Sequence, residues 1–257
     1  MPKIKDVVKI LEDFAPLELQ ASYDNSGLFF GDYQWDLKGV LITLDTSEDV
    51  VKEAIELGAN LIIEHHPSVF MPIKKIDLTY PKHKAIALAI KNDIAIYSAH
   101  TSVDFAVGGL NDRVMELLGC VSYDQSNGNA SDMRIGKLSK AVKLGAFADC
   151  VAQVFDDKHV AFVGDSNKLI STIAVVNGGG GSHEGALVEA KNAGADVFVS
   201  GDFKYNVIRF AKDLGFPVII VGHYNSEVPF LNLIKELLIN NDICNVHSAN
   251  TCTNPLN

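Results

Sequence analysis

The same short pattern, a helix followed by a Gly-Ala turn and an apolar strand, occurs twice in the chain. Residues 53–63 have the sequence EAIELGANLII, and residues 189–199 have the sequence EAKNAGADVFV. Each apolar run is short and follows a glycine, which is typical of a buried strand in a parallel sheet. Parallel strands need a crossover connection, usually a helix. The repeat therefore predicts an α/β protein with two similar strand-helix-strand units.

Both copies continue through another helix to a further strand, at 93–100 in the first half and at 217–221 in the second. Between the halves, residues 125–133 are rich in Ser, Asn and Asp and poor in apolar side chains, which is typical of a linker. We therefore expect an N-terminal α/β domain at 1–124, a linker or mobile loop at 125–133 and a C-terminal α/β domain at 134–257. A cleft between the two domains is the expected place for a site.

Composition excludes several classes of protein. With 257 residues, 47% of them hydrophobic and 21% charged, the chain can bury a sizeable core. A net charge of -10 argues against nucleic-acid binding. The four cysteines form no Cys-x-x-Cys pair, which argues against a zinc ribbon or a redox motif. No run is long enough to span a membrane and no signal-peptide core follows Met1, so we expect a cytoplasmic protein.

Histidines and carboxylates gather where the expected strands end. His65 and His66 follow the apolar run of the first repeat, and His100 ends the next strand, with Asp104 four residues later. Ligands in open α/β sheets bind beyond the carboxyl ends of the strands. In the second half, His223 and Glu227 stand near the turn from the last strand to a helix expected at 228–238, where both side chains can converge.

The adjacent histidines leave more than one arrangement open. Neighbouring residues of a strand point to opposite faces, so His65 and His66 can hold one ion only if the backbone turns between them. Pro67 favours such a departure from the sheet. The two imidazoles can also serve two ions side by side, or they can be ordinary polar residues at a strand edge.

The candidate ligands are three imidazoles and two carboxylates: His65, His66, Asp104, His223 and Glu227. This mixture suits zinc, manganese, iron, cobalt or nickel better than calcium. A single catalytic zinc takes about three protein ligands. Five ligands with a bridging carboxylate suit two ions roughly 3.5–4 Å apart, as in dinuclear hydrolases. Two divalent ions and two carboxylates leave a positive site, which favours an anionic small molecule such as a phosphate compound.

Five segments in order resemble the NIF-three-like family, whose members are often labelled GTP cyclohydrolase I type two homologues. They are YDNSGL at 23–28, EHHP at 64–67, SAHTSVD at 98–104, SGDFKY at 200–205 and GHYNSE at 222–227. The resemblance covers essentially the whole chain. It implies a dinuclear metal site in the cleft between two similar domains, the same five ligands, and a toroidal homohexamer. It also implies that His100 lies near the metals and can act as an acid or base.

Several other positions remain candidates. Asp202, Lys204 and Tyr224 lie at strand ends or beside the metal motifs and are expected to contact substrate. The glycine-rich stretch 177–182 fits a structural turn or a phosphate cradle, although it lacks the Walker lysine. Asn206 replaces a histidine of many relatives, and Ser102 replaces an asparagine. These two changes leave the five ligands intact and put any proton-transfer or substrate role of those positions in question.

These observations predict a metal-dependent hydrolase that acts on a nucleotide or another phosphate compound, with His100 or Glu227 handling protons. Opening of the guanine ring of GTP is the specific reaction that the resemblance implies. The alternative is a hexameric metal-binding or interaction platform with no turnover of its own.

Overall fold

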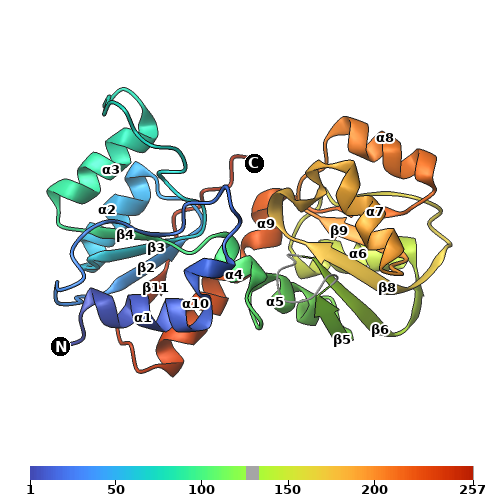
Figure 1. The fold of residues 1–257 in the computed structure, drawn as a ribbon, viewed down its shortest axis with the longest axis horizontal. Helices are drawn as coiled ribbons and strands as arrows, with labels where there is room; N and C mark the ends of the chain where they lie inside the picture. The colour runs from blue at the N-terminus through green and yellow to red at the C-terminus, as the bar shows by residue number, and fades with distance from the viewer. Residues whose placement is uncertain (126–132, 257) are drawn as a thin grey trace. The chain divides into compact units, whose positions relative to one another are not determined.

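The structure is a computed structural model that describes residues 1–125 and 133–256, and it contains two compact units (Figure 1). Unit 1 comprises Met1–Ala106 and the C-terminal segment that starts at Phe230. Unit 2 comprises Val107–Pro229. Each unit is an α/β layer structure with its own sheet.

Among its described residues, unit 1 has a five-stranded sheet in the order β1-β4-β3-β2-β11. The strands are β1 (Gly27–Phe30), β2 (Val40–Thr43), β3 (Leu61–Glu64), β4 (Ala95–Ser98) and β11 (Val246–Ser248). Only β1 runs antiparallel to its neighbour. The helical segments are α1 (Ile4–Phe14), η1 (Leu17–Leu19), α2 (Glu48–Leu57), α3 (Pro81–Lys91), α4 (Thr101–Phe105) and α10 (Pro229–Asn240). Every residue of β2, β3 and β4 is buried, which explains their continuous apolar sequences.

The described part of unit 2 has a six-stranded sheet in the order β5-β6-β8-β9-β10-β7. Its strands are β5 (Cys120–Gln125), β6 (Arg134–Lys143), β7 (Ala161–Val163), β8 (Leu169–Val176), β9 (Val197–Ser200) and β10 (Val218–Ile220). Its helical segments are α5 (Leu110–Leu117), α6 (Leu144–Val154), η2 (Gly178–Ser182), α7 (Glu184–Asn192), α8 (Tyr205–Leu214) and α9 (His223–Glu227). One apolar cluster joins the sheet to α5 and α6, and a second joins it to α7 and α8.

The repeated sequence pattern corresponds to a repeated structure. In unit 1, α2 leads into β3, which lies between the parallel strands β2 and β4. In unit 2, α7 leads into β9, which lies between the parallel strands β8 and β10. Ser47 caps the start of α2, and Gly58 ends it with a left-handed residue. The predicted α/β class with two similar units is confirmed.

The domain boundaries differ from those expected at 1–124 and 134–257. The C-terminal strand β11 pairs with β2, so the end of the chain belongs to unit 1, as the red segment among the blue elements of Figure 1 shows. Strand β5 pairs with β6, so residues 107–125 belong to unit 2. Of the predicted linker, Gln125 ends β5 and Met133 is buried in the core, whereas 126–132 lie outside the described residues.

The helix expected at 228–238 is confirmed as α10, Pro229–Asn240, and a separate short helix, α9, ends before Val228. Proline lacks an N–H and is favoured in the first turn of a helix, which explains why a new helix starts there. In the described part of the chain, every helix is too short or too polar to cross a membrane.

Candidate metal centre

The two adjacent histidines lie just beyond the end of β3. The strand ends at Glu64, the backbone bends away from the sheet, and the ring centroids of His65 and His66 lie 5.0 Å apart. The buried Glu64 carboxyl anchors this bend, because it accepts hydrogen bonds from Ser98 Oγ at 2.6 Å and from Ser68 N at 2.7 Å. Burial raises the pKa of Glu64. The turn after β3, which Pro67 favours, therefore brings both imidazoles to one place.

His100 and Asp104 come from the end of the neighbouring strand, β4, and from α4. The His100 ring lies 5.2 Å from the His65 ring and 5.8 Å from the His66 ring. One nitrogen from each of the three histidines can be chosen so that all lie within 4.8 Å of one another. Asp104 Oδ1 lies 3.9 Å from His65 Nε2. Unit 1 therefore brings together all four of its predicted site residues.

An oxygen acceptor holds the Nδ1 atom of each of these histidines. The distances are 3.0 Å from His65 Nδ1 to the Ala99 carbonyl oxygen, 3.1 Å from His66 Nδ1 to Asp45 Oδ1, and 2.8 Å from His100 Nδ1 to Asp24 Oδ1. A carbonyl oxygen can only accept, so Nδ1 of His65 carries the proton and its Nε2 keeps the lone pair. Metal-binding histidines are oriented in this way.

Asp24 is a functional residue that the local sequence does not reveal, because an Asp-Asn pair before a glycine is also typical of a turn. Besides His100, its carboxylate accepts hydrogen bonds from the Thr101 hydroxyl and from Thr101 N, the latter at 3.0 Å. Burial raises the pKa of Asp24, but the bonds from His100 and Thr101 and the charge of His100 outweigh it, so the pKa lies well below its ordinary value. Asp24 therefore fixes both the ring of His100 and the start of α4.

The candidates of unit 2 lie on one short helix. His223 and Glu227 stand at the two ends of α9, one turn apart, with 3.2 Å between His223 Nε2 and Glu227 Oε2. His223 Nδ1 lies 2.7 Å from Asp202 Oδ2. The hydrogen bond to Glu227 is the main cause that raises the pKa of His223 to about 9, against the opposite effect of burial. The imidazole and the carboxylate thus share a proton that a divalent ion could replace.

The glycine-rich turn η2 packs directly against this pair. Gly178 has a φ of +54°, its N–H donates to Ser226 Oγ at 3.2 Å, and its carbonyl accepts from Asp202 N at 2.7 Å. A side chain at Gly178 would overlap Glu227 Oε1 and would lie 3.1 Å from His223 Nε2. The N–H groups of Gly180 and Gly181 also bond within unit 2. These bonds favour the structural turn over the phosphate cradle.

The comparisons with known proteins agree with the motifs that carry this geometry. Residues 2–255 match the model of the family described as Duf34/NIF3 (NGG1p interacting factor 3). The chain belongs to the Duf34/NIF3 family. It is 37% identical over 239 residues to a "GTP cyclohydrolase 1 type 2 homolog" of Clostridium perfringens, covering 91% of this chain and 90% of the relative.

Two solved structures that resemble this chain in sequence have the same fold. A Bacillus cereus protein related to NIF3 matches with a TM-score of 0.89 and 26% identity, over 100% of this chain and 99% of that one. Reduced HcgD from Methanocaldococcus jannaschii matches with a TM-score of 0.83 and 30% identity, over 97% of this chain and 98% of that one. The name "homolog" of the relatives leaves open whether members catalyse the reaction.

In this Duf34/NIF3 protein, the expected substrate residues have different surroundings. Asp202 is exposed and contacts His223, so it orients a candidate ligand. Lys204 is exposed immediately before α8, and Tyr224 is half-buried in α9. Of the two departures, Ser102 is buried in α4, and Asn206 Nδ2 lies 3.5 Å from Glu184 Oε1. Substrate contact by Asp202, Lys204 and Tyr224 stays a prediction.

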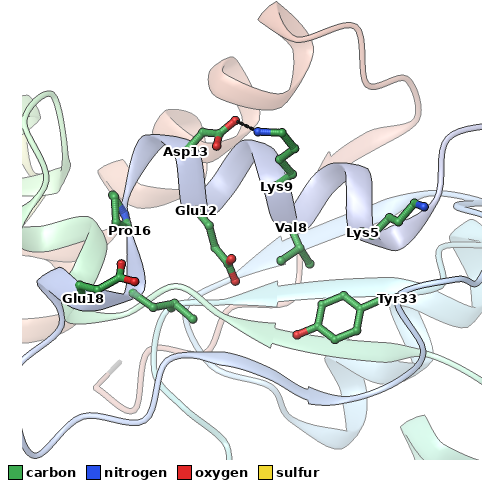
Figure 2. A pocket seen from close by; sticks show the side chains of 9 residues that line it. Lys5, Val8, Lys9, Glu12, Asp13, Pro16, Glu18 and Tyr33 are labelled. Carbon is green, nitrogen blue, oxygen red and sulfur yellow. Dashed lines mark hydrogen bonds and ion pairs between the residues drawn. The ribbon is translucent and has the colours of Figure 1, made fainter.

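A separate surface pocket of about 410 Å³ lies in unit 1 beside α1 (Figure 2). Glu12 on α1 and the hydroxyl of Tyr33 point toward one another across it, and Lys9 pairs with Asp13 at its rim. Its lining includes none of the histidines described above. We therefore assign the metal chemistry to the strand ends and not to this pocket.

The donor set fits a borderline divalent ion. Unit 1 offers His65, His66 and Asp104 with His100 beside them, and unit 2 offers His223 and Glu227. Such ions bind imidazole and carboxylate ligands, and metal-binding imidazoles usually have Nδ1 held by a hydrogen bond. A single centre formed by both units, with two ions, stays a prediction.

Proposed function

We propose that the protein holds two divalent metal ions and hydrolyses a nucleotide or another phosphate compound. The ligands would be His65, His66 and Asp104 from unit 1, with His223 and Glu227 from unit 2. One observation carries the proposal: all four histidines of the motifs have Nδ1 hydrogen-bonded to an oxygen, in each case with Nε2 as the remaining ring nitrogen. Such uniform orientation serves ligation and proton transfer.

The protein side of the reaction follows from the same contacts. When bound, the ions would supply electrophilic activation of an anionic substrate. His100, held by the Asp24 carboxylate, would accept or donate a proton at Nε2. Glu227, only 4% exposed, is the second candidate for proton transfer. The relatives' name makes opening of the guanine ring of GTP the first specific reaction to test.

Metal content tests the proposal directly. Elemental analysis should give about two equivalents of metal per chain after loading with zinc, manganese, iron, cobalt or nickel. A His66→Ala, His223→Ala double variant should lose most of it. His247→Ala is the matched control, because His247 is held by Asn245 Oδ1 outside the site. A native protein that stays metal-free after loading would contradict the proposal.

Turnover requires its own assay. The metal-loaded protein should convert at least one member of a panel of nucleoside phosphates and phosphoesters, and formate release would identify opening of a guanine ring. Loss of turnover in Asp104→Asn, with the fold preserved by circular dichroism, would tie the reaction to the metal residues. If every compound remains unchanged with both metal positions filled, the hydrolase assignment is excluded.

The second candidate is a metal-binding interaction platform, which the family description "NGG1p interacting factor 3" favours. We propose a homohexamer in both cases, on the basis of the family resemblance. Sedimentation should then give a particle of six chains. An Asp104→Asn protein that loses metal but keeps every cellular role would favour the platform over the enzyme.

A further inference from the structure

Two aromatic side chains of unit 1 lie on the surface beside the histidine group. Tyr23 is 69% exposed and Phe70 is 39% exposed, and their ring centroids lie 6.4 Å apart with the planes tilted by 47°. The Phe70 ring centroid is 6.3 Å from that of His100, with the planes nearly perpendicular at 83°. The aromatic pair is therefore adjacent to the candidate metal and proton-transfer residues.

Hydrogen bonds next to each ring fix the two segments that carry the pair. Asp24, which follows Tyr23, is bound to His100 and Thr101. The carbonyl of Val69, which precedes Phe70, accepts a hydrogen bond from Asn25 Nδ2 at 2.5 Å. This bond ties the Tyr23 segment to the Phe70 segment. The rings are therefore held by the same network that orients His100.

Exposure of both aromatic rings to water is unfavourable in free energy, and a ligand that covers the rings removes this cost. An aromatic side chain buries 150–250 Å² when it is covered and prefers offset or edge-on contact with another π system. Because neither ring is buried and the two are not stacked in parallel, both keep accessible apolar surface. Stacking of a nucleobase on an aromatic side chain contributes about 1–3 kcal/mol and works with every base.

We infer that Tyr23 and Phe70 form a stacking site for the planar heterocycle of a nucleotide. The inference rests on the proposed function, because a metal centre beside His100 gives the anionic end of the same ligand a place to bind. A nucleotide carries a planar ring at one end and phosphate at the other, which matches an aromatic pair next to imidazole and carboxylate ligands. An aliphatic or purely sugar phosphate substrate would leave both rings unused.

Two probes distinguish the contribution of the planar ring to binding from that of the phosphate. Affinities for guanosine 5′-monophosphate and for ribose 5-phosphate are measured by calorimetry, with zinc-loaded and metal-free protein. Phe70→Leu and Tyr23→Leu should each weaken binding of the nucleotide by about 5- to 150-fold, the range that the stacking energy implies. Binding of ribose 5-phosphate and the zinc content should remain unchanged.

The chain offers a matched control for each variant. Phe162→Leu corresponds to Phe70→Leu, since Phe162 is 38% exposed in unit 2. Tyr80→Leu corresponds to Tyr23→Leu, since Tyr80 is 62% exposed and contacts only the His83 ring among the aromatic contacts of the described residues. Neither control should change the affinity for the nucleotide.

The inference and the proposed function fail in different ways. Three results would overturn the stacking site. The variants could lose equal affinity for the nucleotide and for ribose 5-phosphate, or neither variant could lose affinity for the nucleotide. The wild-type protein could also bind no nucleotide, whether zinc-loaded or metal-free. A fall in oligomeric state with nucleotide affinity unchanged would overturn the stacking site as well, because the rings would then be subunit contacts. If zinc does not bind but the metal-free protein shows the ring-dependent loss, the hydrolase proposal fails and the stacking site stands.

Discussion

Asp24 and His100 stand 76 residues apart in the sequence, and Asp24 Oδ1 lies 2.8 Å from His100 Nδ1. This contact connects the segment before β1 to the end of β4. The contact fixes the orientation of the His100 ring and the position of the proton on its Nδ1 atom. Without the carboxylate, His100 would lose the partner that fixes its orientation.

We expect Asp24→Asn to lower turnover by about 10- to 100-fold, the usual effect of losing the hydrogen-bond partner of a histidine at a metal site, because His100 is the candidate for proton transfer. Competition with a chelator measures the metal affinity, which should remain unchanged because His100 is not among the five proposed ligands. Asp49→Asn on the exposed surface of α2 is the control, because its loss removes only a surface ion pair. A loss of metal affinity in Asp24→Asn would instead show that His100 binds metal.

Gly178→Ala should lower both stability and metal affinity. An alanine there would have to adopt a φ of +54°, which costs about 1–2 kcal/mol, and its methyl group would displace the Glu227 carboxylate. Gly179→Ala is a close control, since no described atom lies within 4 Å of a Cβ at that position. Thermal unfolding and chelator competition provide the two readouts. If Gly178→Ala and Gly179→Ala have the same stability and the same metal affinity, η2 does not position Glu227.

Glu53→Gln should destabilise the protein by about 1 kcal/mol at neutral pH, because charged hydrogen-bond acceptors are stronger than neutral ones. The Glu53 carboxylate accepts bonds from Asn250 N at 2.7 Å and from Thr251 N at 2.9 Å. Burial raises the pKa of Glu53, but these bonds and that of the Thr251 hydroxyl outweigh it, so the pKa lies below its ordinary value of 4.5.

The pH dependence of this effect has a definite sign. A carboxyl whose pKa is lowered by folding contributes stability above its unfolded pKa, and the contribution disappears as the pH falls through the folded pKa. The difference between wild type and Glu53→Gln in urea unfolding should therefore be largest above pH 4.5 and should shrink below it. Glu56→Gln, exposed on the same helix, should show no such difference.

Asp112→Ala should cost about 3–5 kcal/mol, the usual effect of leaving one charge of a buried pair without its partner. The guanidinium of Arg134, which is 1% exposed, donates to Asp112 from the start of β6. Urea unfolding gives the free energy, and Asp149→Ala on the exposed side of α6 is the control. Replacing both partners, as Asp112→Leu with Arg134→Met, should cost less than Asp112→Ala alone.

Much of the fold follows from local patterns. The runs at 61–63 and 197–199 are apolar because their strands are buried on both faces, and Gly58 ends α2 as the pattern predicts. Pro67 marks the departure of the chain from the sheet, where the histidines meet. Strand β11 escapes prediction, because its three residues form a strand only when the edge of β2 is available.

The partners of the histidines are harder to predict than the histidines. Asp24, Asp45 and the Ala99 carbonyl reach His100, His66 and His65 through the register of neighbouring segments, which no local pattern encodes. Asp24 in particular has the sequence context of a turn. Only its distance to His100 shows that it orients this histidine in addition to forming a turn. Family motifs indicate that such a residue matters but do not say which atom it holds.

The return of the chain to β2 determines the order in which a ribosome can finish the two units. Unit 2, from Val107 to Pro229, is synthesised without interruption, whereas the sheet of unit 1 lacks β11 until Val246–Ser248 have been translated. At roughly 5–20 residues per second, the edge of β2 waits about 10–40 s for its partner. An open strand edge invites pairing with other chains. The sheet of unit 1 is therefore begun before unit 2 and completed after it, and its open β2 edge is exposed to misassembly during the interval.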